Sequence, residues 1–512
     1  MKYSDDLYQL IQVLSQSEKR YIKLIIKAFT SKGTDKQVAL FDAFDKQKEY
    51  DELKIREDFS TIIAAKNFHV AKNRLYNLIL KALYLFHSNN SEKEKNRQAV
   101  FQAKVLLQKG LYKQADSITE KCIKTAKGIE DFPTVVAGLT EYSNSVFAQR
   151  AIVKMQQLVD HNLKEETEVL QNYEESLQYF NLQKRVILMT HQHQMARSEA
   201  DITQMSLIQQ HPLLTKAVED ISSEIAKKFY YTLNGLVARY MGDYERAAKY
   251  WSYFVTEFES IKKPTNNDMY QHVKNLNNMM FLYLEADDAV AAWDSCRQLE
   301  EVAHWDTVKS LPYLVDRINA RIVEFKLEYH LCTQQYQEGL DYLEKNQALI
   351  QSVFDSSDAF RKLVIEHYAT AIYLSNGALE QASKMVLNVL NNKVVKEHSY
   401  IYSEAMLFNI LIHFDLEHYQ LLDSMLLNTY RMLSKRKSLY QTERMVFKHL
   451  KKYLKMPNNK LVLDSLEVLK NELESIRQDK FEKKAFPTFD LIRWIESKIS
   501  GTTMVEITQK KK

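Results

Sequence analysis

Residues 235–251 read GLVARYMGDYERAAKYW and carry the strongest fold signal in this chain. Gly242 separates two segments whose apolar residues recur every three or four positions, which predicts two helices joined by a tight turn. The small residues Gly235 and Ala247 would let the two backbones approach closely, and the ring of Tyr244 would fill the wedge between them. The stretch therefore predicts an antiparallel helix hairpin.

The same Gly-x-aromatic-x-x-Ala pattern occurs at residues 110–115 and, more loosely, at residues 377–382. Weaker echoes of it end at Ala291, at residues 336–339 and at residues 419–422. Internal repetition of this kind is typical of arrays of helical units that stack on their neighbours.

Composition supports an all-helical chain. The 512 residues include 9 Gly and 6 Pro, whereas tight turns between strands and phosphate-binding loops need glycine where the backbone takes a positive φ. The sequence therefore predicts an all-α fold of long helices joined by short polar turns.

The hairpin pattern resembles the tetratricopeptide repeat (TPR), a helix-turn-helix unit of about 34 residues. Trp251 stands where that family packs an aromatic residue of its second helix. The chain departs from the family because no unit has the expected late proline and the turn glycines 110, 242 and 377 are 132 and 135 residues apart. The resemblance implies a TPR-like α-solenoid of antiparallel helix pairs, which we place at residues 91–438.

Other parts of the chain flank this array. Residues 1–90 are expected to form an N-terminal helical module, residues 439–500 a C-terminal helical cap, and residues 501–512 a flexible basic tail. Residues 139–211 contain neither Gly nor Pro, which predicts long helices, with a hairpin break expected near residues 160–162.

The N-terminal module carries a second resemblance. Residues 14–21, 40–52 and 71–80 are similar to the first module of uncharacterised TPR-containing proteins of Bacteroidetes-type bacteria. This resemblance implies no known activity.

No pattern in the sequence indicates catalysis, a cofactor or a metal. His191 and His193 are two residues apart, so a helix would point their rings about 200° apart, away from a shared ion. The three cysteines, Cys122, Cys296 and Cys332, lie far apart and are expected to be buried free thiols. Asp5 and Asp6 precede any apolar segment and no stretch is long enough to span a membrane, so we expect a cytoplasmic protein.

In TPR proteins the first helix of each unit lines a groove that binds peptides. When the TPR groove positions are carried over to this sequence one by one, the resemblance implies a groove suited to an extended acidic or C-terminal peptide. Its candidate residues are Arg97, Lys104, Gln108, Thr232, Leu236, Arg239 and Tyr240.

A basic stretch offers a different candidate. No acidic residue lies between Asp58 and Glu92, where Lys66, Lys72, Arg74 and Lys81 supply four positive charges. A helix with these charges can approach phosphates. Alternatively, it is an ordinary amphipathic helix that docks on its neighbours while its lysine side chains extend into water.

Two functions follow from these patterns. The first is a non-enzymatic scaffold or adaptor that binds a partner protein or peptide in the solenoid groove. The second is a regulator in which residues 1–90 bind nucleic acid and the array senses a protein or peptide.

Overall fold

The computed structural model describes residues 5–29, 35–88, 91–192, 195–262, 264–436, 439–454, 459–482 and 489–511. Within these ranges all regular secondary structure is helical, as the composition predicts, and no strand occurs. The chain divides into two compact units, residues 1–175 and residues 176–512. The expected boundary at residue 90 thus falls inside the first unit.

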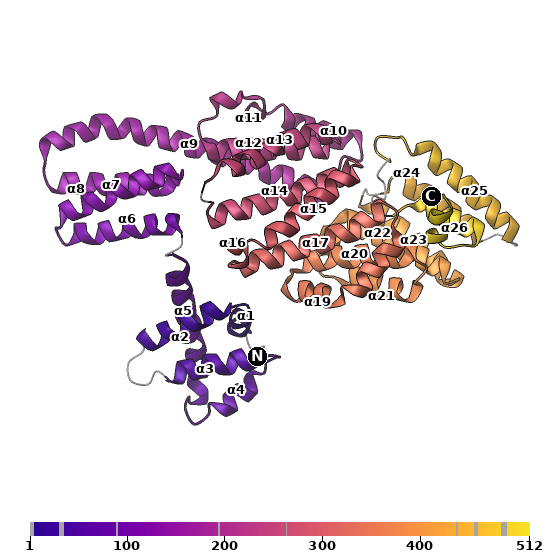
Figure 1. Ribbon diagram of the computed structural model, residues 1–512, viewed down its shortest axis with the longest axis horizontal. Helices are drawn as coiled ribbons and strands as arrows, with labels where there is room; N and C mark the ends of the chain where they lie inside the picture. The colour runs from indigo at the N-terminus through magenta and orange to yellow at the C-terminus, as the bar shows by residue number, and fades with distance from the viewer. Residues whose placement is uncertain are drawn as a thin grey trace. The chain divides into compact units, whose positions relative to one another are not determined.

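The first unit contains the helices up to the middle of α9 (Figure 1). Their bounds are α1 (Asp6–Gln12), α2 (Gln16–Phe29), α3 (Asp35–Lys46), α4 (Glu52–Asp58), η1 (Ala65–Asn67), α5 (Phe68–Ser88), α6 (Glu92–Gln108), α7 (Tyr112–Gly128), α8 (Phe132–Ala148) and α9 (Ile152–Gln192).

The second unit begins within α9 and contains the remaining helices. Their bounds are α10 (Glu199–Gln209), α11 (Pro212–Thr215), η2 (Val218–Asp220), α12 (Glu224–Tyr240), α13 (Tyr244–Ser260), α14 (Asn266–Glu285), α15 (Ala289–Ala303), α16 (Asp306–Lys309), α17 (Pro312–Cys332), α18 (Tyr336–Lys345), α19 (Gln347–Ser356), α20 (Ala359–Ser375), α21 (Leu379–Asn391), η3 (Val395–Glu397), α22 (Ser399–Asp415), α23 (Tyr419–Lys435), α24 (Gln441–Tyr453), α25 (Asn459–Ile476), α26 (Leu491–Ser500) and α27 (Met504–Lys511).

Sequential helices pack as antiparallel pairs, and seven hairpin turns in the described residues share one geometry. In each, a residue with positive φ ends the first helix, and the next helix begins two residues later. Two backbone bonds of 2.8–3.1 Å close each turn in the Schellman pattern, which satisfies the last carbonyls of the first helix. The residues with positive φ are Gly110, Glu130, Gly242, Asp287, Gln334, Gly377 and Glu417.

These turns confirm the predicted hairpins, including the weaker echoes. From residue 242 onward the turn positions 287, 334, 377 and 417 follow at intervals of 45, 47, 43 and 40 residues. Each of these intervals is longer than a TPR unit, which has about 34 residues. The wide gaps between turn glycines arise because four of the seven turns use another residue.

The N-terminal helices α1–α5 surround a core of their own. Ile22, Phe41, Phe44 and Ile79 are fully buried in it, and α5 packs against α2 and α3. Glu18 of α2 and His87 of α5 approach within 2.8 Å and fix one end of that helix pair. Residues 1–90 therefore contain a hydrophobic core of their own.

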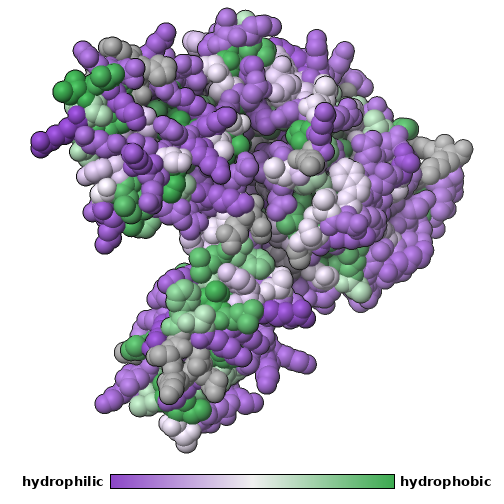
Figure 2. Space-filling view, turned by 60° about the vertical axis from the view of Figure 1, so that its left-hand side comes forward, coloured by the Kyte–Doolittle hydropathy of each residue, from purple (hydrophilic) through white to green (hydrophobic). Residues whose placement is uncertain are grey.

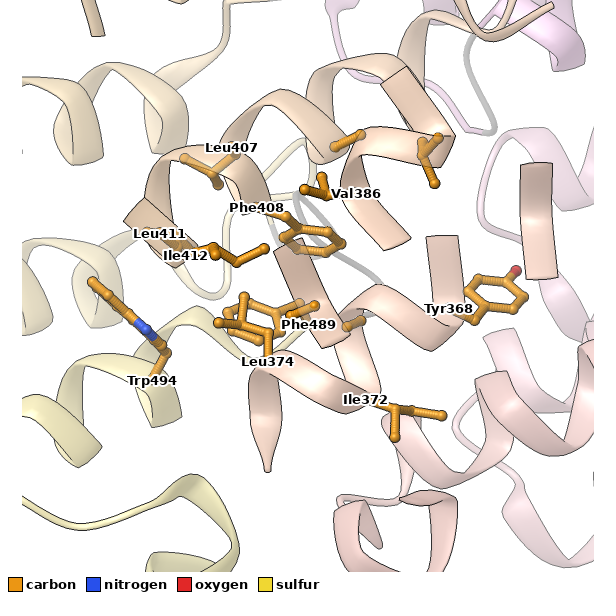
Figure 3. Close-up of a cluster of buried hydrophobic side chains, with 14 of the residues drawn as sticks. Tyr368, Ile372, Leu374, Val386, Leu407, Phe408, Leu411, Ile412, Phe489 and Trp494 are labelled. Carbon is orange, nitrogen blue, oxygen red and sulfur yellow. The ribbon is translucent and has the colours of Figure 1, made fainter. Parts of the chain in front are cut away.

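The largest core lies among the later hairpins of the second unit. Figure 3 shows Phe408 of α22 between Val386 of α21 and Phe489, with Leu374 of α20 and Trp494 of α26 nearby. All five side chains are buried. The last helices are thus part of the main core.

Helices α26 and α27 lie across three of the hairpin turns. The side chain of Gln334 accepts a hydrogen bond of 2.9 Å from Arg493, and Asp415 pairs with Lys498 at 2.7 Å. At the third turn, Thr503 is the side chain nearest to Gly377. The expected flexible tail at residues 501–512 is wrong through residue 511, because Met504 and Ile507 of α27 are buried and hold this helix against the core.

Two further expectations need correction. Helix α9 runs unbroken from Ile152 to Gln192, so the hairpin break expected near residues 160–162 does not exist. Cys122 and Cys296 are buried as predicted, but Cys332, the last residue of α17, is exposed.

Candidate functional site

The predicted groove residues of the first unit share one exposed face of α6. Arg97, Lys104 and Gln108 are all exposed and recur at seven- and four-residue steps, which places them in one row along the helix. Phe101 belongs to the same row and has 67% of its surface exposed. Val105 lies beside it and is also exposed. This face therefore combines exposed basic, amide and apolar groups, of which Arg97 is already paired with Glu94 one turn before it.

The predicted groove residues of the second unit are not open in this way. Arg239 of α12 forms a two-pronged ion pair with Glu285 of α14, in which Nε donates to Oε2 at 2.7 Å. Tyr240 is 1% exposed, so its placement in a groove is wrong. Thr232 and Leu236 are half-buried, and the Thr232 carbonyl accepts a bond from the indole of Trp251.

Paired charges continue through the first helices of the following hairpins. Arg361 of α20 contacts Glu324 of α17 at 3.1 Å, and Arg321 contacts the other oxygen of the same carboxylate. His367 of α20 lies 2.6 Å from Glu404 of α22. We call this set, with its neighbours Glu328 and Tyr368, the polar ladder: Arg239, Glu285, Arg321, Glu324, Glu328, Arg361, His367, Tyr368 and Glu404.

Glu328 is a ladder carboxylate whose ionisation is strongly perturbed. The hydroxyl of Tyr368 donates to its Oε2 at 2.9 Å. Burial raises the pKa of Glu328 to about 7, with Glu285 adding to the rise and Tyr368 and Arg239 opposing it. A carboxyl group in such a setting is half-protonated near neutral pH.

Each arginine of the polar ladder contacts a carboxylate within it. Buried ion pairs of this kind fix how neighbouring helices dock. Removing one partner would leave the other charge buried without a counter-charge. The ladder therefore joins α12 to α14, α17 to α20, and α20 to α22. It explains the stacking of the first helices and offers no unmatched arginine for an anion.

A second charged cluster joins the beginning and the end of the second unit. Arg197, just before α10, contacts Glu443 of α24 at 3.4 Å and Glu482 at 3.3 Å, and its guanidinium lies 4.0 Å from the ring centre of Tyr440. Burial raises the pKa of the Glu443 carboxyl, and Arg197 opposes this rise. These contacts clasp the α9–α10 connection to the C-terminal helices.

The candidate nucleic-acid residues lie on or just before α5. Lys66, Arg74 and Lys81 are exposed, and Lys81 rests 4.1 Å from the ring centre of Phe29 of α2. Lys72 points the opposite way: it is 8% exposed and its ammonium lies 2.6 Å from Glu52 of α4. The assignment of Lys72 to a phosphate-contacting face is therefore wrong, because its charge is already used inside the module.

The open side of α5 contains further exposed residues beside Arg74 and Lys81. Val70, Leu80 and Tyr84 are exposed large apolar residues, and Asn73 and Asn77 are exposed beside them. In the lower part of Figure 2, apolar side chains of this N-terminal module reach the surface among hydrophilic ones. The helical period alone could have grouped these residues with Arg74 and Lys81 once the docked face was known.

The described residues also bear on metal binding and on membrane insertion. No group of three or more His, Cys, Asp or Glu side chains there is arranged to hold a metal ion. No helix among those residues is both long enough and apolar enough to cross a membrane. No protein-family model matches the chain, and no curated protein matches it either.

Proposed function

We propose that this chain is a non-enzymatic scaffold or adaptor of the TPR-like class that binds a partner protein or peptide in the cytoplasm. The observation that carries the proposal is the exposed row on α6. It joins two basic side chains, Arg97 and Lys104, to a large exposed ring, Phe101. An acidic peptide with an apolar anchor would match this row in charge and in chemistry.

The stacked hairpins support the proposal in a second way. Helix α8 packs beside α6 as well as against α7, so the exposed side of α6 continues onto a neighbouring first helix. Arrays of this kind present extended surfaces whose positions are fixed by the packing behind them. The longer intervals between turns mean that the units would be elongated relatives of the TPR hairpin.

Affinity capture from the native host's lysate tests this surface when it compares three proteins. These are the unaltered chain, Phe101→Glu, and the control Leu207→Glu, whose residue on α10 is exposed to the same 67%. A partner of α6 is retained by the unaltered chain and by Leu207→Glu and is lost from Phe101→Glu. Partners that all three proteins retain equally would remove α6 as the binding surface.

A second function, nucleic-acid binding by residues 1–90, is favoured by one specific observation. The open side of α5 contains Arg74 and Lys81 and no acidic residue, because the whole helix lacks Asp and Glu. Lys66 adds a third cation at its start. A surface whose charges are all positive attracts a polyanion, and binding releases the counterions of the nucleic acid. Binding should therefore weaken steeply as the salt concentration rises.

Fluorescence anisotropy with labelled DNA and RNA at increasing salt tests this function. The double variant Arg74→Ala/Lys81→Ala should bind more weakly and depend less on salt. The matched control is Lys121→Ala/Lys124→Ala, which removes two exposed charges from α7. Equal binding by both double variants would reject α5 as the contact surface.

A further inference from the structure

We propose that α5 reads base sequence in the major groove of duplex DNA, with Asn77 and Asn73 contacting base edges. This inference rests on the second function above, nucleic-acid binding by residues 1–90, and goes beyond it by naming duplex DNA and sequence-specific contacts. It follows from three features of α5: the width of its open face, the residues at the centre of that face, and the way the helix is held from behind.

The open face of α5 is a single continuous strip. At about 100° per residue, its exposed residues fall within an arc of about 140°. The members of this strip from His69 to Tyr84, which we call the reading face, are His69, Val70, Asn73, Arg74, Asn77, Leu80, Lys81 and Tyr84. From His69 to Tyr84 the strip is about 22 Å long, which suits a helix lying in one segment of a major groove.

Amide side chains occupy the middle of the reading face. Asn73 and Asn77 are one helical turn apart, and Asn73 donates a 3.1 Å bond to His69 on the same face. The side-chain amide of Asn77 has no hydrogen-bond partner among the described residues. An asparagine amide can bond both N6 and N7 of adenine, and the exposed methyls of Val70 suit the methyl group of thymine.

The positive charges lie toward one edge and just before the start of the helix. Arg74 and Lys81 lie on the same edge, seven residues apart, and Lys66 precedes the helix by two residues. None of the three forms an ion pair with an acidic residue in the described parts of the chain. In this arrangement the basic side chains at the border can contact the phosphates, while the neutral amides at the centre contact the base edges.

The opposite side of α5 is locked into the module. Leu75 and Ile79 are fully buried, and Lys72 is bonded to both Glu52 and the Tyr50 hydroxyl at 2.6 and 2.8 Å. These contacts fix the rotation of α5 about its own axis. A helix held in this way presents its amides in one orientation, which sequence-specific contacts need.

Groove geometry selects DNA over RNA. The major groove of B-form DNA is about 12 Å wide and admits an α-helix, whereas that of A-form RNA is deep and narrow. The lack of any acidic group on the helix favours a polyanion such as DNA as its ligand. We therefore infer duplex DNA as the ligand.

Selection from a random duplex DNA library with the full-length protein tests the inference. We expect enrichment of a short motif that contains adenine. Asn77→Ala should bind random DNA as well as the unaltered chain does but lose about 5- to 150-fold of its discrimination at one base pair. Arg74→Ala should weaken binding to all sequences and leave the motif unchanged.

Alanine favours helix more than asparagine does, so Asn77→Ala should remain folded, which a melting curve checks. Salt-dependent binding without any enriched motif would overturn the inference and leave nucleic-acid binding intact. A motif that Asn77→Ala and Asn73→Ala both preserve would overturn it as well. Absence of all salt-dependent binding would overturn both the inference and the function on which it rests.

Discussion

The indole of Trp251 on α13 lies directly against the backbone of Gly235 on α12. A Cβ atom built on Gly235 would lie 2.5 Å from indole Cδ1 and closer still to Nε1. Trp251 is 3% exposed, so the ring has no free space into which it could move. The absence of a side chain at Gly235 therefore sets how closely the two helices of this hairpin approach.

Gly235→Ala should destabilise the protein by about 1–3 kcal/mol, because the added methyl group overlaps a packed ring. Chemical denaturation measures the change. Gly128→Ala is the matched control, since nothing lies within 4 Å of the added Cβ at the end of α7. The control should be neutral or slightly stabilising. Equal effects of the two substitutions would contradict the close approach.

Glycine should improve the turn at Glu417, where an exposed side chain sits at a φ of 59°. Glu417→Gly is expected to stabilise the protein by about 0.5–1 kcal/mol. The same change at Gln334 removes side-chain bonds to Asp490 and Arg493 of 2.9 Å each, so Gln334→Gly should be destabilising. Thermal melting of both variants would show opposite shifts, and shifts of the same sign would refute the distinction.

Glu328 makes stability depend on pH in a defined direction. Its pKa rises from an ordinary value of 4.5 to about 7 in the folded chain, so the folded state retains a proton that the unfolded state releases. Stability therefore falls as pH rises through this window. Glu328→Gln removes the ionisation and can still accept the bond from Tyr368.

This variant should match the unaltered protein at pH 5 and exceed its stability by about 1–3 kcal/mol at pH 8. Denaturation at the two pH values measures the difference directly, and the groups that face Glu328 from α12, α14 and α20 are unchanged in the comparison. A stability difference that stays constant between pH 5 and pH 8 would show that Glu328 does not titrate in this range.

Arg197→Ala should loosen the junction between the α9–α10 connection and α24. Glu443 would be left buried without its cation, at a cost of about 3 kcal/mol. Hydrogen exchange should increase at residues 440–453. Lys480→Ala is the control because its pair with Glu199 links the start of α10 to the segment after α25 at the surface, where such a pair contributes at most about 1 kcal/mol. Unchanged exchange in Arg197→Ala would argue against the clasp.

The sequence predicts the hairpins well because a helix hairpin is a local structure. The turn at Gly242 and the small contact at Gly235 can be read from spacing alone. Turns at Asp287 and Glu417 escape a search for glycine, since the same two backbone bonds hold a non-glycine residue at positive φ there. Their position is indicated only by the next helix, which begins two residues later.

Side-chain environment is less predictable because it depends on which face of a helix docks. Lys72 is buried because Glu52, on another helix, lies opposite it, and 20 positions in the sequence separate the two. Tyr240 is buried at the end of α12 for a similar reason, since its core includes residues of α9 and α11. Arg97, Lys104 and Gln108 on α6 are exposed in the structure, and their role in a peptide groove stays a prediction.

Helices α26 and α27 give the array a fixed length. A solenoid that ends in an open hairpin can gain or lose a repeat by duplication with little penalty. Here, the final helices contact turns from three different hairpins at once, through Gln334, Gly377 and Asp415. An inserted or deleted repeat would move these turns out of register with the segment that spans them. Helices α26 and α27 therefore fix the number of hairpins beneath them, and that number should resist change during evolution.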